Sequence, residues 1–190
     1  MADRHHHNQP GFTLVEIIVA MAIFVTALTA ISAIFTYANR SQRTTLAVSE
    51  TQGDARFALE VMAQQIRRGS VDYASVQYGG AIASNPQDVL VLRDANNNQV
   101  WFRRTASGSR GIVEMSEDGS TWVDLTPPAV SVDVLRFYIS PATDPFAASA
   151  SSNQQPLVTI AMVSSSTAVG TETVLPAYVQ TTISSRQYAR

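Results

Sequence analysis

Residues 12–35 read FTLVEIIVAMAIFVTALTAISAIF, with one charged side chain, Glu16, and four hydroxyl residues. Such a stretch is apolar on every side of a helix rather than on one face. At about 1.5 Å per residue the helix would be roughly 36 Å long, more than the roughly 30 Å of a bilayer core. The stretch therefore predicts one helix that is long enough to cross a membrane.

A short polar leader precedes this run and ends in Pro10-Gly11. Three interpretations compete: a secretory signal peptide cut near residues 27–30, a plain membrane anchor, and a leader removed directly before the apolar run. A secretory peptidase would discard the run, and Glu16 stands where an apolar signal core should begin. Pro10 breaks helical structure and Gly11 has no side chain to hinder a peptidase, so the third interpretation accounts for the most features.

Glu16 is the most informative residue of the run. An ionised carboxylate inside a membrane costs about 2.5–3.5 kcal/mol on insertion scales, so it requires a partner. Cleavage after Gly11 would create an amine on Phe12, one helical turn before Glu16. That amine could pair with Glu16 of its own chain or of a neighbouring chain, and the helix N-terminus also favours an anion.

The segment Gly11-Phe12-Thr13-Leu14-Val15-Glu16, followed by an apolar run, resembles the cleavage and methylation motif of type IV pilins and type II secretion pseudopilins. The resemblance implies that a membrane prepilin peptidase/methyltransferase cuts after Gly11 and N-methylates Phe12. It also implies that Glu16 guides subunit registration, and that the partners are other pilins or pseudopilins and an assembly platform in the inner membrane. Many major pilins have a proline midway along this helix; this chain has none, so we expect no proline kink.

The helical pattern continues to Arg68 with a single glycine, Gly53, and Gly69 is the expected stop. Apolar residues recur in this part at helical spacing: Leu59, Met62 and Ile66, with Phe57 and Val61 as an adjacent stripe. We therefore expect four segments: a leader at 1–11, a membrane-spanning and filament-core helix at 12–35, its amphipathic continuation at 36–68, and a β-rich domain at 69–190.

After Gly69 the pattern changes to short strands separated by turn residues. Two hairpins are predicted, around loops at 94–98 and 117–120. The predicted strands are 88–93, 99–103, 111–115, 121–125, 132–139, 157–163 and 174–183, and residues 143–155 predict a mobile loop. One helix followed by many strands indicates an α+β fold, in which the long helix packs on an antiparallel sheet.

A second resemblance concerns the type of subunit. Residues 52–60 and Arg67-Arg68 are similar to the helix of J-type minor pseudopilins and W-type minor pilins, and residues 136–138 and 181–184 also fit that group. The resemblance implies a minor subunit. It leaves open a surface pilus, a secretion pseudopilus or a DNA-uptake filament, and a place at the tip or in the shaft.

The composition argues against several other functions. From Gly69 onward seven Arg stand against ten Asp and Glu, the wrong balance for neutralising nucleic-acid phosphates. The chain has no Cys, which excludes thiolate metal sites, and its three His lie in the leader. No catalytic motif or cofactor-binding loop is found, so we expect neither an enzyme nor a cofactor.

Two further patterns have ordinary explanations. Asp94, Asn96 and Asn98 resemble the first ligands of a calcium loop, but the required glycine is missing, so a hairpin turn is the preferred interpretation and no metal is expected. Trp101-Phe102-Arg103 could belong to a nucleic-acid surface, but alternation along a strand favours core packing.

Together these patterns predict a structural subunit of a type IV pilus or type II secretion pseudopilus. We expect it to cross the membrane once, with a cytoplasmic leader and its globular domain outside the cytoplasm, before it enters the filament. The alternative is a membrane protein with one span that does not polymerise and whose outer domain binds a ligand or partner.

Overall fold

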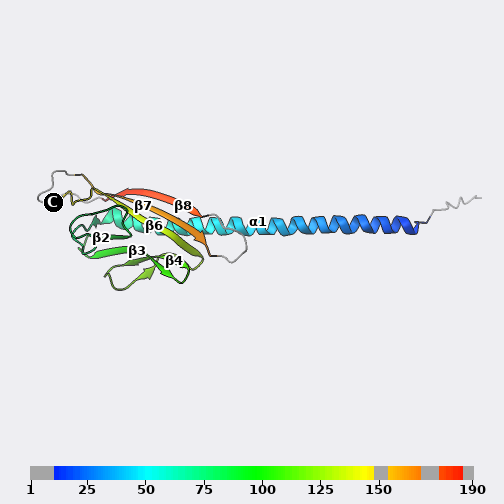
Figure 1. Cartoon of the computed structure of the whole chain (residues 1–190), viewed down its shortest axis with the longest axis horizontal. Helices are drawn as coiled ribbons and strands as arrows, with labels where there is room; N and C mark the ends of the chain where they lie inside the picture. Colours follow the sequence, from blue (N-terminus) through cyan, green and yellow to red (C-terminus); the bar gives the residue numbers. More distant parts are fainter. Residues whose placement is uncertain (1–10, 148–153, 168–175, 186–190) are drawn as a thin grey trace, which may run out of the picture. The chain divides into compact units, whose positions relative to one another are not determined.

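The computed structural model of the chain describes residues 11–147, 154–167 and 176–185. The chain forms two compact units, Met1–Arg43 and Thr44–Arg190. One helix, α1 (Leu14–Arg68), begins in the first unit and ends in the second, and all strands belong to the second (Figure 1). The predicted leader up to Pro10 lies outside the described residues, as do the middle of the predicted loop at 143–155 and the first residues of the predicted strand at 174–183.

The first unit contains the apolar part of α1. Every residue from Gly11 to Arg43 is exposed in the isolated chain. The most apolar 18-residue window of α1 has a mean hydropathy of 2.6, so the helix is long and apolar enough to cross a membrane. The helix begins at Leu14, two residues later than the sequence predicted.

The second unit buries one face of the C-terminal part of α1. The buried residues recur at helical spacing: Thr51, Ala55, Ala58, Leu59, Met62, Ala63 and Ile66. This confirms the predicted stripe of Leu59, Met62 and Ile66. Of the adjacent stripe, Val61 is half-buried, whereas Phe57 lies on the opposite face and is 61% exposed.

Gly69 ends the helix for a reason that the sequence did not reveal. A left-handed cap does not explain this stop, because the backbone φ of Gly69 is not positive. Instead, a Cβ at this position would lie 2.5 Å from the carbonyl oxygen of Arg93. Glycine is therefore required because the backbone of strand β2 (Val89–Arg93) passes close to the helix end.

The predicted α+β fold, a long helix packed on an antiparallel β-sheet domain, is confirmed, and the strands of this domain form two sheets. The larger sheet has the order β1-β2-β3-β4-β5 and the smaller has the order β6-β7-β8 (Figure 1). Their bounds are β1 Ser70–Val71, β2 Val89–Arg93, β3 Gln99–Ser107, β4 Arg110–Ser116, β5 Val123–Asp124, β6 Val130–Ser140, β7 Leu157–Ser166 and β8 Ala177–Ser184. Both predicted hairpins are present, as β2–β3 and β4–β5, while β1 and the hairpin between β3 and β4 were not predicted.

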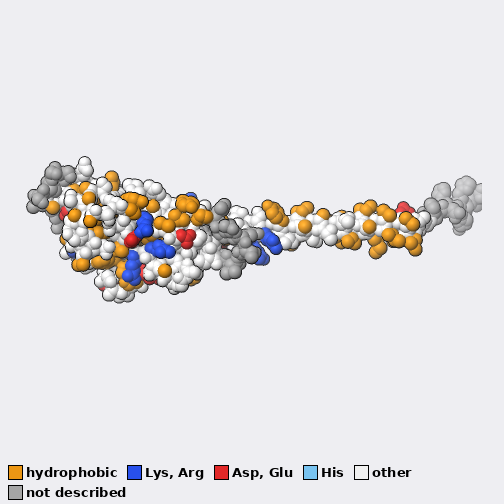
Figure 2. Space-filling model, viewed as in Figure 1, with side chains coloured by type: hydrophobic (Ala, Val, Ile, Leu, Met, Phe, Trp, Pro, Cys, Tyr) orange, Lys and Arg blue, Asp and Glu red, His pale blue; other side chains and the backbone are white. Residues whose placement is uncertain are grey.

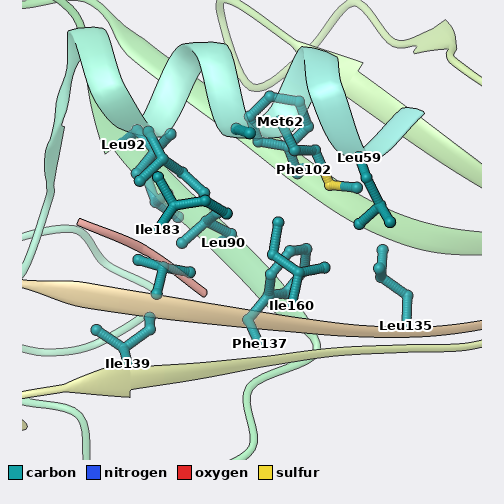
Figure 3. Packing of buried hydrophobic residues seen from close by; sticks show 14 of the residues in the cluster. Leu59, Met62, Leu90, Leu92, Phe102, Leu135, Phe137, Ile139, Ile160 and Ile183 are labelled. Carbon is teal, nitrogen blue, oxygen red and sulfur yellow. The ribbon is translucent and has the colours of Figure 1, made fainter. Parts of the chain in front are cut away.

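One hydrophobic core lies between α1 and the two sheets. Figure 3 shows Leu59 and Met62 extending from α1 toward Phe102 of β3 and toward Phe137 and Ile160 of β6 and β7. Phe102 and Phe137 are both 0% exposed. Removing such a ring from a packed core costs about 3–5 kcal/mol, so these contacts from both sheets hold the second unit together.

Backbone pairing also joins the two sheets. Gln87, just before β2, exchanges two hydrogen bonds with Phe137 of β6, at 2.7 and 2.9 Å. The side-chain amide of Asn85 donates to the carbonyl of Ile139 at 2.9 Å, and its oxygen accepts from the Ile139 N–H at 3.1 Å. Residues 85–87 therefore cover the edge of β6 that β7 does not pair.

The side chain of Tyr78 likewise hydrogen-bonds to the backbone at the edge of β2. Its hydroxyl donates to the carbonyl of Val89 at 3.0 Å and accepts from the N–H of Val91 at 2.9 Å. The short strand β1 pairs only with Leu92 and Arg93, so Tyr78 satisfies backbone groups that β1 does not reach. Burial raises the pKa of Tyr78 well above its ordinary value, which keeps the hydroxyl protonated and able to donate.

The residues proposed as a partial calcium loop hold the β2–β3 turn. The carboxylate of Asp94 accepts from the backbone N–H groups of Asn96 and Asn98, both at 2.8 Å, and Asn97 adopts a φ of 66°. With these two hydrogen bonds, the carboxylate of Asp94 points toward the N–H groups of its own loop. The described residues contain no group of three or more His, Cys, Asp or Glu that could hold a metal ion.

We predict that Gly111→Ala destabilises the second unit by about 1–3 kcal/mol or more, as overpacking does. A Cβ on Gly111 would overlap the carbonyl oxygen of Val132, where β4 meets β6. The measurement is urea unfolding of the whole chain in detergent micelles, followed by tryptophan fluorescence.

Gly53→Ala is the matched control, because a Cβ there meets nothing within 4 Å. Within a helix this exchange should stabilise by about 1 kcal/mol. Equal unfolding free energies for Gly111→Ala and the wild-type chain would contradict the close approach of β4 and β6.

A second prediction concerns Asp118 in the β4–β5 loop. Its carboxylate accepts from the backbone N–H groups of Thr121 at 2.6 Å and Ser120 at 2.8 Å, which holds its pKa well below the ordinary value. Because the folded pKa is lowered, the stabilisation is complete above the unfolded pKa of about 3.9 and is lost as pH falls below it.

Asp118→Asn should therefore unfold more easily than the wild-type chain at pH 7, with a smaller difference at pH 3. Urea unfolding at the two pH values measures this change. A difference between the two chains that is independent of pH would show that the carboxylate charge plays no part in the loop.

Candidate functional site

The three residues before α1 form a short non-helical segment. Gly11, Phe12 and Thr13 have no helical or strand assignment, and all three are exposed. Phe12 is 79% exposed. The peptide bond between Gly11 and Phe12 is thus accessible and lies outside the helix, as a proteolytic site requires.

Thr13 sets the first residue of the helix. Its hydroxyl oxygen accepts from the N–H of Glu16 at 3.2 Å, and its carbonyl accepts from the N–H of Ile17 at 3.2 Å. This is the position of an N-cap, and Thr-x-x-Glu at 13–16 is the sequence pattern of a capping box. The pattern was readable in the sequence and would have predicted the helix start at Leu14 rather than Phe12.

Glu16 lies in the first turn of α1, where the helix dipole favours its negative charge. The residue is exposed, and it forms no ion pair with any residue that the structure describes. Phe12 lies four residues earlier, just outside the helix. The carboxylate is therefore available to a cation from outside the described chain or to a new amine on Phe12.

Three threonine hydroxyls in the apolar part or directly after it bond to their own helix. Thr26 donates to the carbonyl of Ile23 at 2.8 Å, Thr29 to that of Thr26 at 2.8 Å, and Thr36 to that of Ser32 at 2.9 Å. Each bond satisfies a donor that would otherwise be costly in an apolar environment. These threonines therefore do not oppose burial of the helix in lipid or among other helices.

The apolar side chains of this part are exposed, and no other described segment of the chain covers them. Large side chains are between 46% and 79% exposed, and Figure 2 shows hydrophobic groups along this part of α1. They are Phe12, Leu14, Val15, Ile17, Ile18, Val19, Met21, Ile23, Phe24, Val25, Leu28, Ile31, Ile34 and Phe35. A surface of this size is not stable in water, so it requires lipid or partner helices.

The other candidate residues belong to the fold. Phe102 is in the core, while Arg103 stacks on Trp122 at 3.5 Å and pairs with Glu114 at 2.9 Å. The aromatic and basic neighbours at 101–103 are thus occupied within the second unit. His5, His6 and His7 lie outside the described residues.

Comparison with known proteins places this segment in context. Residues 6–32 match the family model described as the prokaryotic N-terminal methylation motif. This motif is the prepilin-type signature of type IV pilins and pseudopilins, so the resemblance seen in the sequence is confirmed. No match was found among the curated proteins or among the solved structures.

We predict that Thr13→Ala weakens the first turn of α1 by about 1 kcal/mol, because the N-cap acceptor is lost. Amide hydrogen exchange of residues 16 and 17 in micelles should then be roughly fivefold faster. Thr13→Ser, which keeps the hydroxyl, is the control. Equal exchange in the Ala and Ser variants would show that Thr13 does not cap the helix.

Proposed function

We propose that the chain is a minor structural subunit of a type IV pilus or type II secretion pseudopilus. The observation that carries this proposal is the exposed Gly11–Phe12 bond, two residues before a capped helix whose apolar part is wholly exposed. The match at residues 6–32 supports a pilin-like or pseudopilin subunit and a structural role.

The proposed processing follows from this geometry. A prepilin peptidase cuts between Gly11 and Phe12 and leaves α1 intact, and N-methylation then modifies the Phe12 amine. The amine provides a positive charge one turn from Glu16, in the same chain or in a neighbour. Pairing neutralises the carboxylate, which otherwise opposes transfer of the helix into an apolar filament core.

The proposed organisation keeps the four segments expected from the sequence. Residues 1–11 are the leader, 12–35 cross the inner membrane and later form the filament core, 36–68 continue the helix, and 69–190 form the outer domain. The partners are the prepilin peptidase/methyltransferase, other pilins or pseudopilins and the inner-membrane assembly platform. The J-type or W-type resemblance of residues 52–60 supports a minor subunit.

The first test is the intact mass and N-terminal peptide of the protein from its native membrane. We expect a chain that begins at N-methylated Phe12. A chain that still begins at Met1 would favour a plain membrane anchor, and one that begins beyond Ala30 would favour a secreted domain.

Glu16→Gln tests the assembly step separately. Cleavage and membrane insertion should persist, because Gly11 and the apolar run are unchanged. Loss of a buried ion-pair partner costs about 3–5 kcal/mol, so recovery in sheared filaments should fall by more than about a hundredfold. Glu117→Gln, at an exposed position of the second unit, is the matched control. Normal recovery of the Glu16 variant would exclude the proposed pairing.

A further inference from the structure

A cleft opens in the second unit where the smaller sheet meets the larger one. β6 contacts β2, β3 and β4, but its backbone pairs with the segment before β2 only through Gln87 (Figure 1). The space beside this pairing has a volume of about 320 Å³, within the range of roughly 300–1,000 Å³ that is common for ligand sites. Its lining residues are Asp88, Arg104, Asp133, Val134, Leu135 and Arg136.

Arg104 is fixed at the wall of this cleft without an ionic partner among the described residues. Its Nε donates to the carbonyl of Val132 at 2.6 Å. Gly111 leaves room for the guanidinium, because a Cβ there would lie 2.8 Å from both Nε and Nη2 of Arg104. The side chain is thus held in place by one donor, while its positive charge and its other N–H groups are available to an anion.

The other charges of the cleft limit the kind of anion. Arg136 pairs with Asp88, and Asp133 accepts only from the hydroxyl of Ser131, at 3.3 Å, among the described residues. Two Arg and two Asp give the cleft a net charge of zero, so the two carboxylates oppose a phosphate or another ligand of charge −2. A single carboxylate adds less negative charge and matches the planar fork of Arg104.

An apolar row leads from the cleft across the smaller sheet. A register shift between Val132 and Val134 accompanies the outward position of Val134, which lines the cleft and is 38% exposed. Val134 pairs with Val163 of β7, which pairs with Tyr178 of β8, and Tyr178 is 76% exposed. At about 4.8 Å between strands, this row is roughly 10 Å long. Figure 2 shows hydrophobic side chains next to charged ones over these strands.

We propose that this surface binds the C-terminal end of a partner polypeptide. The terminal carboxylate binds Arg104 in the cleft, and apolar side chains of the last residues lie on the row of Val134, Val163 and Tyr178. The unpaired cation selects the carboxylate, and the adjoining row selects an apolar body behind it. All of these residues belong to the second unit, so the proposal does not depend on cleavage at Gly11 or on filament assembly.

Titration with a short peptide tests this proposal. The probe is N-acetyl-Ala-Leu-Val with a free carboxylate, added to the ¹⁵N-labelled full chain in detergent micelles, and the amide shifts of Val134 and Val163 are followed. We expect saturable shifts. The same peptide with a C-terminal amide should bind about tenfold more weakly, because it lacks charge-assisted hydrogen bonds to Arg104.

Three results of this titration would overturn the proposal. Equal affinity of the free and amidated peptides would exclude recognition of the carboxylate. Equal affinity of the free peptide and of N-acetyl-Ala-Glu-Val amide would show that any carboxylate suffices and that the chain end is not recognised. Binding of inorganic phosphate as tight as that of the peptide would show an anion site without a peptide.

Substitutions separate the role of Arg104 from a loss of folding. Arg104→Gln should weaken binding of the free peptide about tenfold, whereas Arg103→Gln, which removes the same charge on the opposite face of β3, should change it little. Asp133→Asn should instead strengthen binding several-fold, because a like charge leaves the cleft. A misfolded chain cannot produce this gain. Equal losses in the two Arg variants, or no gain in Asp133→Asn, would contradict the proposed site.

Discussion

Among the residues that the structure describes, none covers the apolar part of helix α1, and this constraint governs the rest of the structure. Its large side chains from Phe12 to Phe35 are all at least 46% exposed. Water cannot accommodate such a surface, so the chain needs lipid or other helices along this length. The one carboxylate of this part, Glu16, lies at its very start, where the helix dipole and a nearby amine can compensate for it.

After Arg43 the same helix has to pack on the sheets of the second unit. There one face packs into the second unit, and Leu59 and Met62 contact residues of both sheets. Neither sheet alone encloses the core: Phe102 comes from the larger sheet and Phe137 from the smaller. The helix is therefore an internal element in one part of its length and an unpartnered surface in another, a combination typical of a subunit that assembles through one helix.

Local contacts set the boundaries between these roles. Thr13 caps α1 so that the Gly11–Phe12 bond stays outside the helix. Gly69 lets the helix end against the backbone of β2, and Gly111 lets β4 meet β6. These are small steric and hydrogen-bonding effects, but each decides where an element begins or ends or how closely two elements approach.

Much of this protein is determined by its sequence alone. The length and composition of residues 12–35, the isolated Glu16 and the Pro10-Gly11 boundary predict the long helix and the candidate processing site, because these features are local and have few alternatives. Hairpin loops such as 94–98 are also predictable, since turn residues act over a few positions. The tertiary structure alone decided the division into two sheets, the need for glycine at Gly69 and Gly111, and the exposure of Phe57. Each depends on which distant backbone or side chain comes within a few ångströms, and periodicity along one segment carries no information about that neighbour.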